Sequence, residues 1–306
     1  MMEQITQKNK LDQLLAELEG FVELTPEELE EIRAIHDALV GEFGDLHEAY
    51  DEMYDEFFAR FDDILLTSPL KRPLSGSNYL NTYHDDEYYE NRSETRLNLL
   101  AYSQPDQLKE WAEFIKNEVM KVLLDGLEGE YVDGGVKTIE SMEERMRSRA
   151  QYTKLRGISC IRDLIKGKFV GETLLDVERA VKSIRHDIPL GQRASVLNSY
   201  SGIFGDWRQG ENKYRPKPYL ATHFIIKVDD DLTYELQVKT RRADLVGKLD
   251  HPIRVKKQVT VSDQLKKFVE ALAWGTHLLD LREYAQDEIP RTYSRISQEI
   301  VDKIEE

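Results

Sequence analysis

The chain has 306 residues, of which 40% are hydrophobic and 33% are charged, a composition typical of a folded protein with a sizeable core. No apolar run approaches the roughly 20 residues that a membrane-crossing helix needs, so we expect no membrane partner. Residues 1–10 are polar and lack the apolar centre of a secretory signal. The single cysteine, Cys160, cannot form an internal disulfide. We therefore expect a bacterial-type cytoplasmic protein.

The net charge of −16 is unevenly distributed along the chain. Residues 1–130 carry a net charge of about −20, whereas residues 131–306 carry about +4. An acidic region repels phosphate backbones, which argues against broad nucleic-acid binding through it, while the basic remainder suits a small polyphosphate. The division predicts an acidic helical N-terminal region, 1–130, and a second domain, 131–306.

Helices dominate the predicted structure of the first region. Residues 4–19 carry leucines on one side, which indicates a short amphipathic helix. Thr25 and Glu28 form a capping box with Pro26 at the first helical position, and they predict a helix from there to about Leu65. Apolar residues on this helix alternate steps of four and three, a heptad seam made of Leu39, Phe43, Leu46, Tyr50, Met53 and Phe57. We expect a long helix that packs on the chain itself or joins copies into a homo-oligomer.

Residues 66–95 interrupt the helical pattern with prolines, glycine and serines, and they are rich in tyrosine. The run His84-Asp85-Asp86 within them lacks the spacing of a metal site, so we interpret it as part of an exposed polar loop. Its aromatic side chains offer an alternative role as a cover for a nucleotide pocket. A helix is predicted to follow, from about 103 to 124.

The second region alternates helical and strand patterns. The expected elements are a helix after Lys137 and another at 173–185, a strand at 155–161, a long loop at 186–218, a hairpin at 219–240, and helices at about 260–284 and 288–304. Strands interleaved with helices predict an α+β fold, a mixed β-sheet with flanking helices.

The hairpin carries the most informative polar pattern. Two apolar and β-branched runs, 224–228 and 232–238, flank three consecutive aspartates. Because side chains alternate along a strand, Glu235, Gln237 and Lys239 share one face. Such a face is most often a solvated surface, and the alternative is a polar site built on a rigid sheet.

Two further segments carry polar residues at suggestive spacings. Lys137, Ser141 and Arg145 recur at every fourth position, which is one face of a helix near its start and suits the oxygens of a polyphosphate. A solvated helix face has the same pattern. Tyr219 and His223 stand at the start of the hairpin, where an aromatic side chain can stack on a base. Glu235 is a carboxylate able to hold Mg²⁺ or accept a proton from an attacking hydroxyl.

Four motifs in this order resemble the synthetase domain of the RelA/SpoT family. The stretch VKTIESMEERM at 136–146 resembles the K-x-x-x-S-x-x-x-K helix of that family, with arginine as its last cation. YLATH at 219–223 resembles the Y-R-S-L-H loop, and YELQVKT at 234–240 resembles the E-I-Q-I-R-T strand. LDHPIRVKK at 249–257 resembles the E-H-x-x-x-Y-K helix that follows.

The resemblance implies a nucleotidyltransferase-like fold and transfer of pyrophosphate from ATP to the ribose 3′-hydroxyl of GDP or GTP, with Mg²⁺ as cofactor. It places Lys137, Ser141 and Arg145 around the donor phosphates. It implies that Tyr219 stacks on the acceptor base beside His223 and that Glu235 serves Mg²⁺ and the acceptor hydroxyl. The other residues that it places at the nucleotide are Gln237, Lys239, His251 and Lys256.

The chain departs from the family at its first strand, which carries a metal-binding aspartate in a D-x-x-G-x-R pattern. Aligning that strand with 154–159 puts Lys154 in the Asp position and Ser159 in the Arg position. Asp163 takes this role only if the strand begins later. The departure leaves open a catalytically inactive nucleotide-binding or regulatory protein, and a toxin-type relative that acts on tRNA. A purely structural protein built on the heptad seam is the third alternative.

Overall fold

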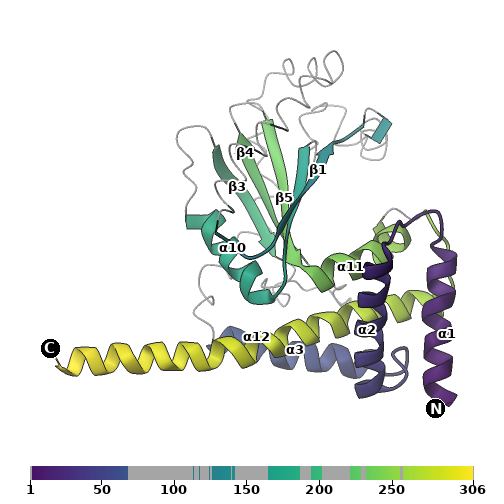
Figure 1. The fold of residues 1–306 in the computed structure, drawn as a ribbon, viewed down its shortest axis with the longest axis horizontal. Helices are drawn as coiled ribbons and strands as arrows, with labels where there is room; N and C mark the ends of the chain where they lie inside the picture. Colours follow the sequence, from purple (N-terminus) through teal and green to yellow (C-terminus); the bar gives the residue numbers. More distant parts are fainter. Residues whose placement is uncertain are drawn as a thin grey trace, which may run out of the picture.

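The computed structural model describes residues 2–67, 126–138, 140–141, 165–186, 194–201, 221–228, 232–255 and 258–305, together with the single positions 113, 117 and 124. Two layers are visible in Figure 1, a twisted sheet and a helical layer below it. None of the described helices is long and apolar enough to cross a membrane.

The sheet has five strands in the order β1-β2-β5-β4-β3. Its strands are β1 (Glu130–Val136), β2 (Ile165–Gly171), β3 (Ala194–Ser201), β4 (Thr222–Val228) and β5 (Leu232–Thr240). β2 pairs with β5 in parallel, and the other three pairings are antiparallel. The fold is therefore α+β with a mixed sheet and flanking helices, which confirms the predicted class. The predicted hairpin is confirmed as β4 and β5.

One face of the sheet is apolar and is covered by α10 (Leu174–His186), which confirms the helix predicted at 173–185. Phe224, Leu236 and Val238 from the central strands are fully buried there. The helix contributes its own apolar side, made of Leu174, Val177, Ala180, Val181 and Ile184, to the same core. The opposite face of the sheet is thereby left to the polar residues of β2, β4 and β5.

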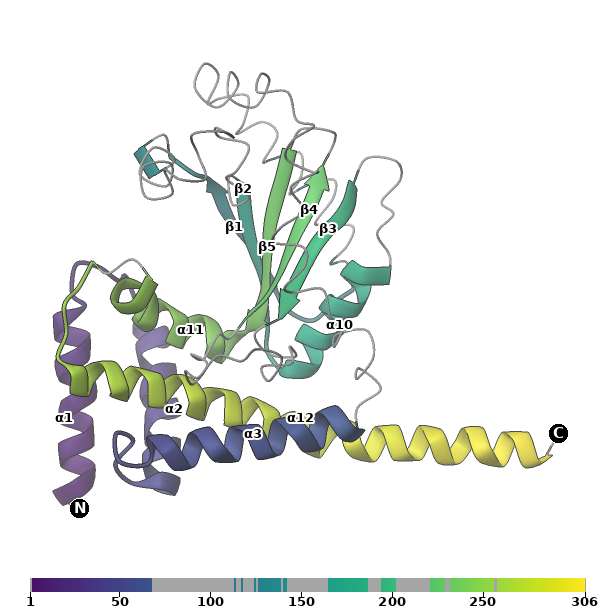
Figure 2. The same ribbon diagram turned by 180° about the vertical axis from the view of Figure 1, so that it is seen from behind.

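Three helical elements follow β5 directly. They are α11 (Arg241–Asp250), the π-helix η6 (His251–Val255) and α12 (Asp263–Glu305), of 43 residues. The prediction of two helices separated near Pro290 is wrong, because α12 runs through that proline. A proline removes one main-chain hydrogen bond from a helix but does not end one that is continued on both sides. Figures 1 and 2 show α12 passing beneath the sheet, and it contacts α2, α3, α10 and α11.

The N-terminal helices are α1 (Met2–Glu17), α2 (Pro26–Phe43) and α3 (Tyr50–Thr67). The capping box is confirmed: the hydroxyl of Thr25 accepts from the main-chain N–H of Glu28, and the Glu28 carboxylate accepts from that of Thr25. The continuous helix predicted to reach Leu65 is wrong, since it is interrupted between α2 and α3. Gly44 adopts φ +76°, a conformation that favours glycine, and Asp45 accepts from the main-chain N–H of His47 at 2.8 Å.

The heptad seam packs within the chain. Helix α3 lies alongside α12 in both views, and the two run parallel. Tyr50 donates to Glu270 at 3.3 Å. Phe57 packs against Trp274, one turn after Glu270, with 4.6 Å between ring centroids and 55° between the ring planes. Leu39, Leu46, Tyr50, Met53 and Phe57 are buried in the same core as the apolar face of the sheet.

Three strands were not expected from the sequence. β1 ends one residue before Lys137, after which a helix was expected, β2 begins after the strand predicted at 155–161, and β3 lies inside the loop predicted at 186–218. β3 reads ASVLNSYS, a polar run of low strand propensity, and its pairing with β4 over the whole of its length outweighs that propensity. The tyrosine-rich loop, the helix at 103–124, the strand at 155–161 and Cys160 lie outside the described residues, apart from α3 reaching Thr67 and the three single positions.

Candidate functional site

The second face of the sheet gathers polar side chains from three neighbouring strands. They are Lys166 and Lys168 of β2, His223 of β4, and Glu235, Gln237 and Lys239 of β5. The side chains of Glu235 and Lys239 are each only 14% exposed, so the interpretation of this strand face as a solvated surface is wrong for them. We call this set the polar face.

Glu235 is held by two neighbours on the polar face. Nδ1 of His223 lies 2.6 Å from Oε1 of Glu235, and the Gln237 side-chain amide donates to the same oxygen at 3.4 Å. His223 is 6% exposed and reaches Glu235 from the adjacent strand, where its Cα partner is Gln237. The arrangement fixes the direction of the carboxylate and couples it to an imidazole. A carboxylate so placed is able to accept a proton from a substrate hydroxyl while the imidazole stays within hydrogen-bonding distance.

A second cluster lies at the other end of the polar face. Asp244, in the first turn of α11, contacts Nζ of Lys239 at 2.8 Å and also pairs with Lys168. Burial opposes ionisation of Asp244, but the two ammonium groups outweigh it and hold its pKa below the ordinary value. Burial lowers the pKa of Lys239, although Asp244 opposes the shift. Two cations and one carboxylate leave this cluster with a net positive charge.

Sequence reasoning had not found Lys166, Lys168 or Asp244. The alternation of Lys166, Gly167 and Lys168 in β2 was a signal for the lysines, because it puts both cations on one strand face. Asp244 carried a weaker signal, since it follows Lys239 by five residues and the strand ends between them. Its role depends on how β5 turns into α11, which the sequence pattern does not give.

Lys137 and Ser141 follow β1 at the edge of the sheet. Val136 pairs with Ile165 of β2, and Ile165 pairs with Tyr234 of β5, so Val136 lies in the row next to Glu235 and Lys137 follows it one residue further from Glu235. Both side chains are half-buried, and the main-chain N–H of Ser141 donates a hydrogen bond to the hydroxyl of Thr138 at 3.2 Å. The register therefore brings these two residues to the end of the sheet at which Glu235 lies.

The other expected site residues divide into two groups. His251 is described, but it begins η6 beyond α11, whose ten residues put about 15 Å between it and the end of β5, and its side chain is exposed. The structure therefore does not bring His251 to Glu235. Arg145, Tyr219 and Lys256 lie outside the described residues.

The register of β2 offers a second way to align the family's first-strand pattern with this chain. The described strand that runs parallel to β5 begins at Ile165, ten residues after the strand start assumed at Leu155. Lys154 therefore does not occupy the position that precedes this strand. In the sequence, Asp163 stands two residues before it, and Lys168 takes the place of the strand's cation.

The described residues hold no group of three or more His, Cys, Asp and Glu side chains that could bind a metal ion. Mg²⁺ is commonly held by one or two carboxylates together with substrate phosphates and water, so a complete protein cage is not required. Glu235 fits such a role because it is ionisable, oriented by its neighbours and partly exposed.

No protein-family model and no curated protein matches the chain. Solved structures do. A GTP pyrophosphokinase family protein from Streptococcus pneumoniae is 20% identical, and the match covers 63% of this chain and 92% of that one with a TM-score of 0.42. Small alarmone synthetase 2 from Bacillus subtilis is 18% identical over 63% of this chain and 96% of its own, also with a TM-score of 0.42. Small alarmone synthetase 1 from Bacillus subtilis, bound to its product pppGpp, is 15% identical over 66% and 96%, with a TM-score of 0.42.

At TM-scores of 0.42 these matches carry no argument about this chain, so what it binds is argued below from its own residues.

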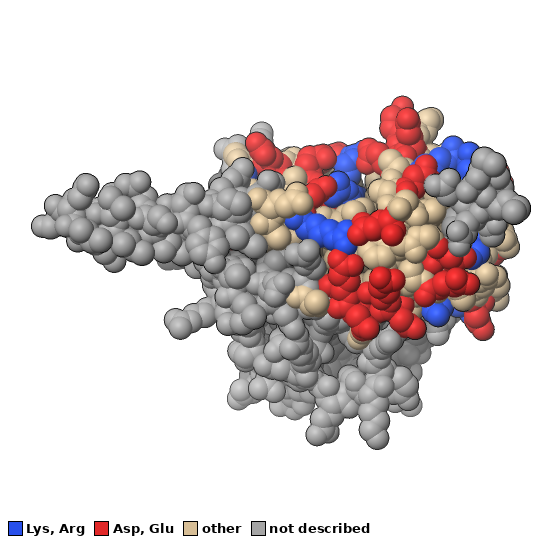
Figure 3. Space-filling model, turned by 90° about the horizontal axis from the view of Figure 1, so that it is seen from below, with Lys and Arg blue, Asp and Glu red and all other residues tan. Residues whose placement is uncertain are grey.

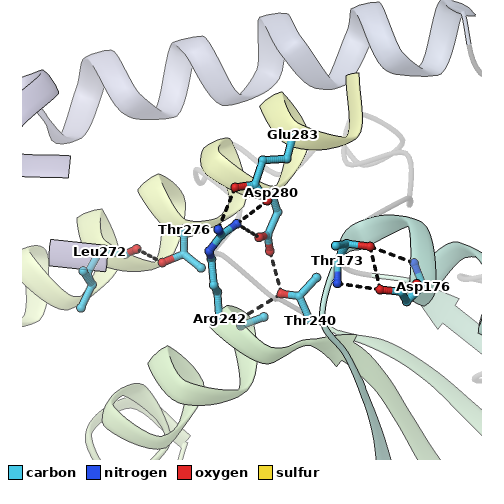
Figure 4. Close-up of polar contacts among 9 residues, drawn as sticks. Thr173, Asp176, Thr240, Arg242, Leu272, Thr276, Asp280 and Glu283 are labelled. Carbon is cyan, nitrogen blue, oxygen red and sulfur yellow. Dashed lines mark hydrogen bonds and ion pairs between the residues drawn. The ribbon is translucent and has the colours of Figure 1, made fainter. Parts of the chain in front are cut away.

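A buried network supports the end of β5 from below. The hydroxyl of Thr240, the last residue of β5, accepts from the main-chain N–H of Ala243 at 3.1 Å and so caps α11. The same hydroxyl donates to Asp280 of α12 at 2.6 Å, and Arg242 donates to Asp280 at 3.1 Å, as Figure 4 shows. Arg242 also forms two hydrogen bonds to Glu283. The strand that carries Glu235, Gln237 and Lys239 is therefore anchored on α12.

Proposed function

We propose that the chain binds nucleotides on the polar face of its sheet and transfers pyrophosphate from ATP to the 3′-hydroxyl of a GDP- or GTP-type acceptor. The observation that carries the proposal is Glu235, held by His223 and Gln237 on the same face as three lysines. A carboxylate with an imidazole partner supplies a base, and a group of cations beside it supplies compensation for phosphate charge.

In the proposed reaction, the acceptor 3′-oxygen attacks the β-phosphorus of ATP, the bond to the α-phosphate oxygen breaks, and AMP leaves. Glu235 takes the proton of the attacking hydroxyl, and His223 stabilises the carboxylate before the transfer. The ammonium groups of Lys168 and Lys239 neutralise phosphate oxygens. Lys137, which follows the edge strand β1, neutralises further phosphate oxygens there. When bound at Glu235, Mg²⁺ supplies further neutralisation of the phosphate charge.

Asp163 completes the proposal as the second carboxylate. Its sequence position, two residues before β2, is where the family pattern has its metal-binding aspartate, and β2 is the strand beside Glu235. Substituting Asp163→Asn is expected to abolish transfer, because one carboxylate then remains for the cation. Lys154→Asp, by contrast, is expected to give no gain of activity. An increase of activity in Lys154→Asp would restore the original alignment.

Two alternatives remain for the same site. A toxin-type activity on tRNA needs a surface that tolerates a polyanion. Figure 3 shows acidic side chains gathered on the face opposite the sheet. Helix α3 carries three exposed acids, Asp51, Glu52 and Asp55. This acidity argues against tRNA lying across the helical layer, although it leaves the sheet side free to receive an acceptor end. A catalytically inactive nucleotide-binding protein is the second alternative.

The deciding experiment incubates the purified chain with radiolabelled ATP, Mg²⁺ and one of GDP, GTP or total tRNA, and separates the products by thin-layer chromatography. We expect a labelled guanosine product, and we expect Glu235→Gln to lower its rate by 100-fold or more, the usual size of a general-base effect. Glu48→Gln, at an exposed position before α3, is the matched control and should leave the rate unchanged.

Binding is measured in parallel by calorimetry. Nucleotide binding without transfer to any acceptor would favour the inactive alternative. Labelling of tRNA alone would favour the toxin-type activity. Neither binding nor transfer with any of the three acceptors would refute the proposal of a nucleotide site.

A further inference from the structure

Asp244 is a buried acid that the proposed reaction does not use. It lies in the first turn of α11, five residues after Lys239, and its side chain is 13% exposed. One carboxylate oxygen contacts Lys239 at 2.8 Å, and the other accepts from Lys168. The two lysines belong to different strands, so Asp244 joins β2 and β5 at the same point of the polar face.

Two ammonium groups bound to one carboxylate lie close together, and their mutual repulsion is strong where little water separates them. Without a shared counter-ion, the side chains would turn apart or one of them would lose its proton. Lys239 is the more vulnerable of the two, because it is 14% exposed, against 24% for Lys168. Burial already lowers its pKa, and Asp244 is the main opposing influence.

We propose that Asp244 is a positioning residue, which holds the ammonium groups of Lys168 and Lys239 together so that the pair receives a phosphate group of the nucleotide. This inference rests on the proposed function for the identity of the ligand. The lysine pair offers two donors on one face of the sheet, and Asp244 reaches them from α11. Asp244 contacts both lysines, and in this proposal it acts through them.

The other charged groups around Lys239 do not replace Asp244. Lys248, one turn further along α11, adds a positive charge and lowers the pKa of Lys239 further. Lys248 itself is engaged at 2.7 Å by Glu28, the carboxylate of the capping box of α2. The acid that remains within reach of both lysines, among the described residues, is Asp244.

The first test measures the protonation of Lys239 directly, in the absence of nucleotide. Lysine side chains labelled with ¹³C and ¹⁵N are followed by NMR as the pH is raised, and the signal of Lys239 is assigned from its loss in Lys239→Arg. We expect the midpoint for Lys239 to be lower in Asp244→Asn than in wild type by at least one pH unit. Asp263→Asn, which removes an exposed acid from the start of α12, should leave the midpoint unchanged. Equal midpoints in wild type and Asp244→Asn would overturn the inference.

The second test measures the affinity for ATP and for GTP, each with Mg²⁺, between pH 7 and 9. Asp244→Asn is expected to bind about tenfold more weakly at pH 7, with a loss that grows as the pH rises, because Lys239 then loses its proton. Asp244→Glu should recover most of the affinity, which a role in folding alone does not predict. Equal or tighter binding by Asp244→Asn across the whole pH range would show that Asp244 competes with the ligand and would refute the inference. If wild type binds neither nucleotide, the proposed function fails, and the titration of Lys239 still decides whether Asp244 holds the lysines.

Discussion

At the scale of single residues, Gly167 shows how closely the sheet is packed beside the polar face. The hydroxyls of Tyr131 and Tyr234 meet at 2.5 Å on the apolar side, from the strands on either side of β2. Burial raises the pKa of both tyrosines, so both hydroxyls stay protonated and share a hydrogen bond. A methyl group at Gly167 would lie 2.0 Å from the Tyr234 hydroxyl oxygen and 2.6 Å from that of Tyr131.

Gly167→Ala is therefore expected to lower the free energy of unfolding by about 1–3 kcal/mol, the usual cost of forcing extra volume into a packed core. Urea denaturation measures it. Gly247→Ala is the matched control, since a methyl group there meets no atom within 4 Å and the position lies inside α11. That control should raise stability by up to about 1 kcal/mol. A neutral Gly167→Ala would mean that the tyrosine pair moves apart freely.

Asp280 makes stability depend on pH. Burial raises its pKa from 3.8 to about 6, against the opposing hydrogen bond from Thr240 and the charge of Arg242. The folded state thus binds the proton more tightly than the unfolded state does. The resulting stabilisation is complete below pH 3.8 and is lost as the pH rises through about 6, with a total of about 3 kcal/mol.

Asp280→Asn has no such titration. The difference in unfolding free energy between wild type and this variant should therefore fall as the pH rises from 4 to 7. Burial also lowers the pKa of His277, one turn earlier, to about 3, and this acts in the opposite sense; it is present in both proteins and cancels. A difference that stays constant over this range would contradict a raised pKa for Asp280.

At the scale of elements, the crossing of α12 with α2 and α3 depends on one small residue. A methyl group at Gly275 would lie 2.5 Å from side-chain carbons of Leu39 and Met53, which are fully buried. Glycine thus lets α12 approach both N-terminal helices closely.

Gly275→Ala should cost about 1–3 kcal/mol of unfolding free energy, because the helices must separate or Leu39 and Met53 must leave their rotamers. Gly41→Ala, on the exposed side of α2 with no atom within 4 Å, is the control and should stabilise slightly. Thermal denaturation compares the two. Equal stabilisation by both substitutions would show that the crossing has room to spare.

Elements with local signals were predictable from the sequence, and those that depend on distant partners were not. The capping box at Thr25 and the alternation of β5 each lie within a few residues of sequence, and the structure confirms both. The interruption after α2 was missed because the heptad seam continues through Leu46, which is buried even though it is not helical. The position of β2 was missed because its register is set by β1 and β5. The contact of His223 with Glu235 follows from pairing between strands, and no single motif encodes it.

At the scale of the whole molecule, the division at residue 130 remains a prediction, and one buried cluster extends across it. Residues of α1, α2 and α3 share this cluster with the apolar face of the sheet and with α10, α11 and α12. We therefore expect a single cooperative unfolding transition, with the same midpoint by tryptophan fluorescence and by circular dichroism. Two separated transitions would instead show that 1–130 and 131–306 unfold independently.

The parallel pairing of α3 with α12 also has a consequence for biosynthesis. Its contacts join residues about 220 positions apart, such as Tyr50 with Glu270 and Glu56 with Arg282. A ribosome adds about 5–20 residues per second, so α3 waits roughly 10–40 s for its partner to be made. During this interval the apolar seam of the nascent chain has no permanent cover. The N-terminal helices are therefore the part of the chain that would depend most on a chaperone before the final helix emerges.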